Sequence, residues 1–226
     1  MLKLFELWIR HPDLTRRQAL DRYTDEYAPM LAESLGLDVL RYVGNFGVPA
    51  REAAPYDGID EYWLDAESLE SLPGAGDARA RQRSFVGANQ FMLAEPIVHV
   101  DHARHHRGIK SMFLLTRRPE MTRDESMAYW RERHVPLVMQ TLGAHLVRYT
   151  TNVGLPTNLN GWPGECSPYD GIAELWLDLD VHGMYAFVGE AASTLLPDER
   201  AFLGTYRVML AEEQVHRGHA DDPLPQ

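Results

Sequence analysis

The chain has 226 residues, of which 45% are hydrophobic and 24% are charged, a composition typical of a globular protein with a sizeable core. Its formal net charge of -11 argues against nucleic acid and anionic membrane surfaces as partners. The single cysteine, Cys166, excludes an internal disulfide, and no apolar run approaches the length of a membrane span. We therefore expect a cytoplasmic protein.

The first half of the chain predicts alternating strands and helices. "LKLFELWI", from Leu2, predicts a strand, because Lys3 and Glu6 interrupt its apolar run and no signal-peptide cleavage site follows. Thr15 and Gln18 form a capping box that predicts the start of a helix, and this helix is expected to end near Gly36. Strands follow at "VLRYVGNF" and "GIDEYWLD", then a weaker helix and a last strand.

The second half repeats this order. With a shift of 107 residues, "RYVGNFGVP" lies over "RYTTNVGLP", and beyond two short insertions "PYDGIDEYWLD" lies over "PYDGIAELWLD" and "MLAEPIVH" over "MLAEEQVH". Each half reads β-α-β-β-α-β, the order of the ferredoxin-like motif. We predict an α+β fold of tandem ferredoxin-like repeats that pack their sheets together, with a first repeat at 1–100, a second at 107–216 and a loose tail at 217–226.

The second half also carries the residues of a family resemblance. "YWRERHVPL" from Tyr129, "VRYTTN" and "PYDGIAELWLD" resemble the EthD-like family of the dimeric α/β-barrel superfamily, and the first half resembles a degenerate copy in which Tyr27 replaces His134. The resemblance covers the whole chain as two fused copies and implies an intrachain dimeric α/β barrel. Members of this superfamily include cofactor-free monooxygenases, decarboxylases, polyketide cyclases, isomerases and haem enzymes, so the fold does not fix the reaction.

His134 is the candidate catalytic residue. Met127, Trp130 and His134 have the spacing i, i+3, i+7 and share the apolar face of a predicted helix, so His134 is expected to point inward. Pro136 disfavours helical geometry at Val135, which predicts that His134 lies in the last turn or at a kink. An imidazole there could serve in general acid–base catalysis, and the alternative is a core histidine bonded to a backbone carbonyl. The resemblance favours the catalytic role.

Residues shared by both halves are expected to serve the fold. Arg41 with Glu61 and Arg148 with Glu174 predict cross-strand ion pairs, although Glu174 shares a strand face with Trp176 and could be a buried carboxylate. Asn45 and Asn152 are interpreted as turn or strand-end residues. The residues predicted to bind a substrate are Met127, Trp130, Tyr149, Asn152, Glu174 and Trp176, with Tyr27 as a minor candidate in the first half.

Two other candidate sites are weaker. His99, His102, His105 and His106 could bind a metal, but they fall in a linker and no further ligand completes the set, so we predict no metal site. Cys166 has no identifiable base, and its loop, with Trp162, could be a lid over the second pocket. No nucleotide-binding or haem-specific motif is present, so we expect no cofactor.

The sequence therefore favours a cofactor-independent enzyme, of lyase, cyclase or isomerase type, in which His134 moves a proton on a small hydrophobic, aromatic or polyketide-like molecule. The alternatives are an EthD-type cofactor-free monooxygenase and a non-enzymatic accessory protein of a catabolic oxygenase system. A homodimer of the tandem chain is a further expectation.

Overall fold

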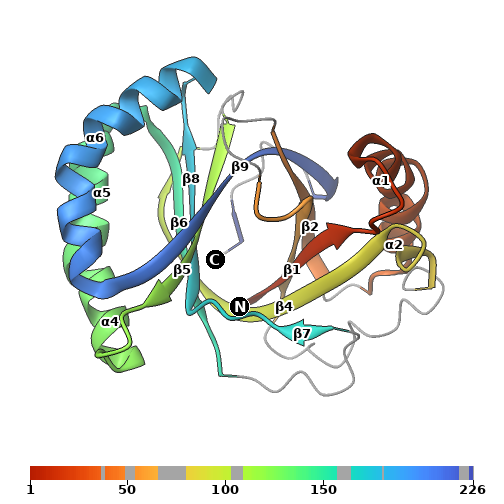
Figure 1. Ribbon diagram of the computed structural model, residues 1–226, viewed down its shortest axis with the longest axis horizontal. Coiled ribbons are helices and arrows are strands. Elements are labelled where there is room, and N and C mark those ends of the chain that lie inside the picture. The colour runs from red at the N-terminus through yellow and green to blue at the C-terminus, as the bar shows by residue number, and fades with distance from the viewer. Residues whose placement is uncertain are drawn as a thin grey trace.

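A closed antiparallel β-barrel forms the centre of the molecule (Figure 1). The computed structural model describes residues 1–36, 39–48, 54–65, 80–102, 109–156, 164–179, 181–218 and 224–225. In these residues the strands form a nine-stranded sheet in the order β1-β3-β2-β9-β5-β8-β6-β4-β7, and pairing of β1 with β4 closes the ring. Only β7 lies outside the ring, where it pairs with β4.

Each half of the chain contributes four strands of the ring. The strands of the first half are β1 (Leu2–Arg10), β2 (Val39–Gly47), β3 (Gly58–Leu64) and β4 (Val86–Asp101). Those of the second half are β5 (Ile109–Arg117), β6 (Leu146–Gly154), β8 (Gly171–Leu177) and β9 (Leu203–Arg217), and the short β7 is Glu165–Cys166. The two sets join along their edges, β2 with β9 and β4 with β6, so the expected α+β fold with a closed barrel is present.

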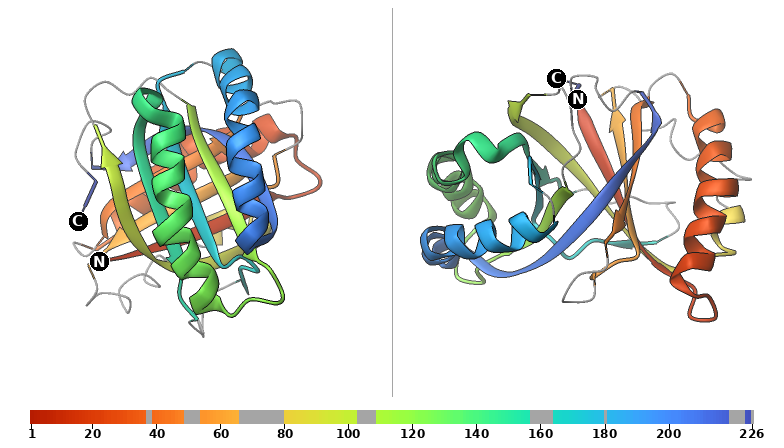
Figure 2. Two further views of the ribbon diagram at one scale, coloured as in Figure 1. Left: turned by 90° about the vertical axis from the view of Figure 1, so that its left-hand side faces the viewer. Right: turned by 90° about the horizontal axis from the view of Figure 1, so that it is seen from above.

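Helices cover two opposite outer faces of the barrel (Figure 2). On one face lie α1 (Arg16–Arg22), η1 (Tyr23–Tyr27) and α2 (Ala28–Ser34). On the other face lie α4 (Arg123–Tyr129), η3 (Trp130–His134), α5 (Val135–Leu142), the short η4 (Gly143–His145) and α6 (Val181–Phe202). One apolar core lies under each group of helices and a third fills part of the barrel interior. Within the described ranges, no helix combines the length and apolar content that a membrane crossing would need.

The helix that carries His134 continues through Pro136. Val135 is helical, with φ -56° and ψ -51°, and its N–H donates to the carbonyl of Trp130 five residues earlier. This π-helical turn accommodates a proline that has no N–H to donate. Of the two predicted positions of His134, the last helical turn is wrong, because the helix extends to Leu142, and His134 instead ends the π-helical turn.

Buried charges join the two halves inside the barrel. Lys3 Nζ lies 2.6 Å from a carboxylate oxygen of Glu61 and also contacts Glu174, while Lys110 Nζ lies 2.5 Å from Glu174 and also contacts Glu61. All four side chains are at most 2% exposed. Because each lysine contacts a glutamate from both halves, this cluster ties the first half to the second.

The predicted arginine–glutamate pairs are wrong because the strand register separates them. Arg41 lies opposite Trp63 and bonds to Glu213, and Arg148 lies opposite Trp176 and bonds to Asp101.

The two asparagines are not turn residues, since both lie within strands. The amide of Asn45 donates to Glu61 at 2.7 Å, and that of Asn152 donates to Glu174 at 2.8 Å. Each amide also donates to a backbone carbonyl of the neighbouring strand, so the asparagines orient the buried carboxylates.

The structure describes residues 217, 218, 224 and 225 of the C-terminal segment. Strand β9 extends to Arg217, and Leu224 is buried, with its N–H donating to Asp101 at 2.9 Å.

Candidate active site

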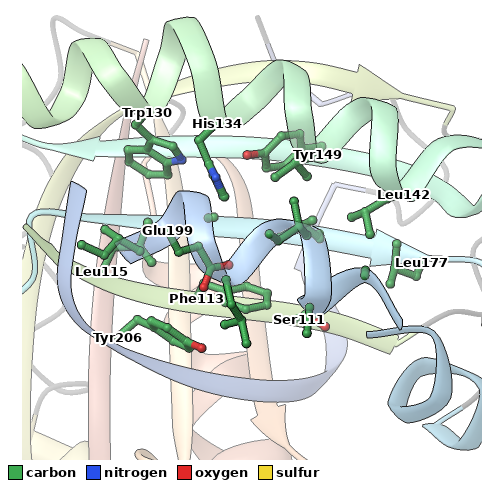
Figure 3. Close-up of a pocket in the computed structure, with 18 residues that line it drawn as sticks. Ser111, Phe113, Leu115, Trp130, His134, Leu142, Tyr149, Leu177, Glu199 and Tyr206 are labelled. Carbon is green, nitrogen blue, oxygen red and sulfur yellow. The ribbon is translucent and has the colours of Figure 1, made fainter. Parts of the chain in front are cut away.

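A cavity of about 100 Å³ lies between the barrel and the helices of the second half (Figure 3). Its wall on the barrel side comes from β5, β6, β8 and the start of β9, and its other wall comes from η3, α5 and α6. The lining is mostly leucine, alanine, valine and aromatic side chains. The polar side chains that line it are Ser111, His134, Tyr149, Glu199 and Tyr206.

Strand alternation decides which predicted residues reach this cavity. On β8, Ala173, Leu175 and Leu177 face the helices and line the cavity. Glu174 and Trp176, between them, face the barrel interior, where the Trp176 ring lies 4.4 Å from Lys110 Nζ.

The structure therefore brings together only part of the predicted substrate-binding set. Trp130, His134 and Tyr149 line the cavity, and Met127 packs in the same core without lining it. The expectation that Asn152, Glu174 and Trp176 share this pocket is wrong, because they lie on the opposite face of the sheet.

Asp198 on α6 orients His134. Nδ1 of His134 lies 2.7 Å from Oδ2 of Asp198, and the Tyr129 hydroxyl donates to the other carboxylate oxygen at 2.8 Å. The ring of Phe202 packs against His134, with 5.1 Å between ring centroids. Hydrogen bonding and packing together hold the imidazole in one orientation.

The environment of His134 favours a neutral ring. Burial lowers the pKa of His134 below its usual 6.5, and the hydrogen bond and negative charge of Asp198 offset only part of this effect. A carboxylate only accepts hydrogen bonds, so the proton of the neutral ring is on Nδ1. Nε2 then carries a lone pair and makes no hydrogen bond within the described residues, so it is free to accept a proton from a bound molecule.

Trp130 is fixed against the barrel by a glycine. A Cβ atom at Gly171 would lie 2.7 Å from a ring atom of Trp130, so a larger residue there would displace the indole. On the same wall, burial raises the pKa of Tyr149 well above its usual value, which keeps this phenol protonated. Both rings line the cavity together with His134.

In the first half, side chains fill the corresponding space. Tyr27 is fully buried and packs against the rings of Tyr23 and Phe85. The Tyr23 hydroxyl donates to Asp60 at 2.7 Å, and Trp8 stacks on Tyr23 with 5.6 Å between ring centroids. Tyr27 thus belongs to a packed core and does not line the cavity.

Among the described residues of the other candidate sites, none lines this cavity. In the described part of the chain, no group of three or more His, Cys, Asp or Glu is arranged to hold a metal ion, and His105, His106 and Trp162 lie outside that part. Cys166 is exposed on β7 beside β4, away from the cavity.

Sequence reasoning missed Asp198 and Glu199. Both follow Pro197 on α6, in a stretch whose helical pattern is weak because a proline interrupts it. The available signal was the difference in residue type, since Arg81 and Gln82 stand at the same distance before Met92 as Asp198 and Glu199 do before Met209.

Comparison with known proteins agrees with this architecture. Residues 118–205 match the EthD domain model. No curated protein sequence matches the chain.

Among solved structures, the chain is similar to an anthrone oxidase-like protein, with 12% identity, a TM-score of 0.63 and coverage of 97% of this chain and 94% of that chain. A proposed monooxygenase from Lactobacillus acidophilus shares 8% identity, with a TM-score of 0.57 and coverage of 95% and 94%. A mutant chlorite dismutase from Candidatus Nitrospira defluvii shares 10% identity, with a TM-score of 0.54 and coverage of 93% and 91%. At these identities the likeness concerns the fold. Residues 118–205 are thus similar to the EthD domain, and the chain adopts, over nearly its whole length, the α/β-barrel fold of these structures.

Proposed function

We propose that the protein is a cofactor-independent enzyme in which His134 moves a proton on a small hydrophobic, aromatic or polyketide-like substrate bound in the second-half cavity. The observation that carries this proposal is the 2.7 Å contact between His134 and Asp198 at the wall of an apolar cavity. A histidine whose Nδ1 is held by a carboxylate has its Nε2 positioned as a general base, and such a base typically contributes roughly 10²–10⁴-fold to a rate.

Proton removal is a first step that several reaction classes share. Taking a proton from a carbon beside a carbonyl, or from a phenol, gives an enolate or phenolate. Lyase, cyclase and isomerase reactions can start from this anion, and the apolar lining of the cavity suits the ring system of such a substrate.

An oxidative reaction is the second candidate, because the structures with this fold include an anthrone oxidase-like protein and a proposed monooxygenase. Dioxygen would be the co-substrate. With anthrone as probe, both C–H bonds of the methylene carbon break, one oxygen atom of dioxygen becomes its new carbonyl, and the other leaves as water with the two hydrogens. Oxygen consumption equal to anthraquinone formation would identify this reaction.

The two-copy organisation is part of the same proposal. Its support is the matching placement of Asn45 with Glu61 and of Asn152 with Glu174, together with the same strand order in each half. In this organisation the second copy, 107–216, holds the working cavity, and the first copy, 1–100, completes the barrel.

Hydrogen–deuterium exchange tests the proposal without knowledge of the natural substrate. 2-Indanone is a small apolar ketone with acidic methylene hydrogens, and proton NMR in D₂O follows their replacement. We expect the protein, without added metal, flavin or haem, to accelerate this exchange beyond an equal concentration of free imidazole. Binding of 2-indanone and anthrone without acceleration of exchange or oxidation would instead indicate the accessory binding protein.

A further inference from the structure

Glu199 brings a second ionisable group into the cavity. It follows Asp198 on α6, and Figure 3 shows its carboxyl group and the His134 ring projecting into the same space, with Phe113 alongside. Oε2 of Glu199 is shielded from solvent and has no hydrogen-bond partner among the described residues. A shielded carboxyl oxygen without a partner is costly unless a ligand supplies one.

The first half shows what a side chain at this position does when it has an internal partner. Gln82 is the first-half counterpart of Glu199. Met92, which pairs with Phe5, corresponds to Met209, which pairs with Met112, and each of the two residues lies ten positions before its methionine.

The amide of Gln82 donates to Glu6 at 2.6 Å. In the second half, Phe113 on β5 corresponds to Glu6. Glu6 pairs with Phe91 and Phe113 pairs with Val208, the residues directly before the two matching methionines. Phe113 has no polar side-chain atom, so the carboxyl group of Glu199 is left facing the cavity.

The surroundings of Glu199 favour its protonated form. Burial raises the pKa of Glu199, and the negative charge of Asp198 raises it further. The other titratable groups facing this space are His134, Tyr149 and Tyr206, and none of them carries a positive charge when His134 is neutral. A protonated carboxyl group can donate one hydrogen bond.

We propose that Glu199 is a second catalytic residue of the cavity, donating a hydrogen bond to a substrate oxygen while His134 removes a proton. The C–H bond breaks, its proton goes to Nε2 of His134, and the electron pair moves toward the carbonyl to form an enolate. The enolate oxygen accepts the hydrogen bond of Glu199. This inference rests on the proposed function and narrows the substrate class to hydrophobic molecules with a carbonyl or phenol oxygen beside the acidic hydrogen.

A matched pair of ligands tests the inference by binding. 2-Indanone and indane have the same ring system, but only the ketone has an oxygen that accepts a hydrogen bond. We expect the wild type to bind 2-indanone about three- to tenfold more tightly than indane, the gain of one net hydrogen bond. Glu199→Leu should remove this preference, and Glu199→Gln should keep it because its amide also donates. Glu190→Gln, on the exposed part of α6, is the control and should behave as the wild type.

The ¹³C NMR signal of 2-indanone labelled at its carbonyl carbon gives a second readout. A hydrogen bond to the carbonyl oxygen shifts this signal downfield, so we expect the shift in the wild type and not in Glu199→Leu. Equal binding of the two ligands by the wild type, an unchanged preference in Glu199→Leu, or no binding of either ligand would overturn the inference. If the preference for 2-indanone over indane depends on Glu199 but the protein does not accelerate hydrogen–deuterium exchange, the hydrogen bond of Glu199 is upheld and the proposed function is contradicted.

Discussion

His134 depends on a residue from another helix for its chemistry. The carboxylate of Asp198 fixes the proton on Nδ1 and leaves Nε2 for the substrate, whereas the Tyr129 hydroxyl holds the carboxylate itself in place. This arrangement separates the group that moves the proton from the groups that position it.

Replacing Asp198 with Asn should lower the rate of proton exchange by about tenfold or more, because an amide does not hold the imidazole in the required tautomer as a carboxylate does. Asp198 raises the pKa of His134 against the effect of burial, so its loss should lower that pKa further. The base is active above its pKa, and the fall of activity on the acid side should therefore move to lower pH. A pH–rate profile checks both effects. Glu190→Gln, on the exposed part of α6, is the control and should keep the wild-type profile, and an unchanged Asp198→Asn profile would contradict the role of Asp198.

For single residues of the cavity, the sequence predicted correctly those that helical spacing alone brings to one face. Trp130 and His134 share a helix face, and this was sufficient to direct both into the cavity. Asp198 lies 64 residues away in sequence, and no periodicity connects it with His134. Glu174 and Trp176 were assigned to the cavity because they share a strand face, but the opposite face is the one that the helices cover.

At the scale of the element, the helix that carries His134 begins with a capping box. Thr122 accepts a hydrogen bond from the N–H of Glu125, and the Glu125 carboxylate accepts one from the N–H of Thr122. Thr15 and Gln18 form the same box on the first-half helix. Both boxes were predicted from the sequence, since they need only local contacts. The π-helical turn was not predicted, because the steric rule for a residue before proline disfavours the α region, whereas Val135 adopts it.

Thr122→Ala and Thr15→Ala should each lower the free energy of unfolding by about 1 kcal/mol, the usual effect of removing an N-terminal cap. Chemical denaturation measures this loss. Because only the second-half helix carries His134, any effect on proton exchange should be confined to Thr122→Ala. A reduced exchange rate in Thr15→Ala with an unchanged rate in Thr122→Ala would contradict the assignment of the chemistry to the second half.

At the scale of the whole molecule, buried charges link the two halves. Burial alone would raise the pKa of Glu61, but Lys110 and Lys3 outweigh this effect and hold its pKa below the usual 4.5. The stabilisation from Glu61 is therefore present above about pH 4.5 and is lost as the pH falls through its pKa in the folded protein.

Replacing Lys110 with Met should lower the free energy of unfolding by roughly 3–5 kcal/mol, because it leaves two buried carboxylates to share the charge of Lys3. Adding Glu61→Gln should recover part of this loss, since the double variant again balances the charges. Denaturation at neutral pH measures both variants. A loss below about 1 kcal/mol in Lys110→Met would show that the cluster does not link the halves energetically.

The overall architecture was predictable to the level of element order and a barrel. In the second half the order of strands and helices follows from local patterns, whereas the second helix expected in the first half falls mostly outside the residues that the structure describes. The barrel followed from the family resemblance. Two features could not be predicted: the edge pairings of β2 with β9 and of β4 with β6, and the lysine–glutamate cluster. Both join residues more than 40 positions apart. Both also depend on strand register, which composition and periodicity do not fix.

The exchange of the 2-indanone methylene hydrogens in His134→Gln and Tyr27→Phe tests the central claim most directly. The two residues occupy matching helix positions in the two halves, but only His134 lines the cavity. We predict that His134→Gln lowers the protein-catalysed exchange rate by roughly 10²–10⁴-fold, while Tyr27→Phe leaves the rate near that of the wild type. A wild-type rate in His134→Gln, or a loss of exchange in a folded Tyr27→Phe variant, would contradict the account.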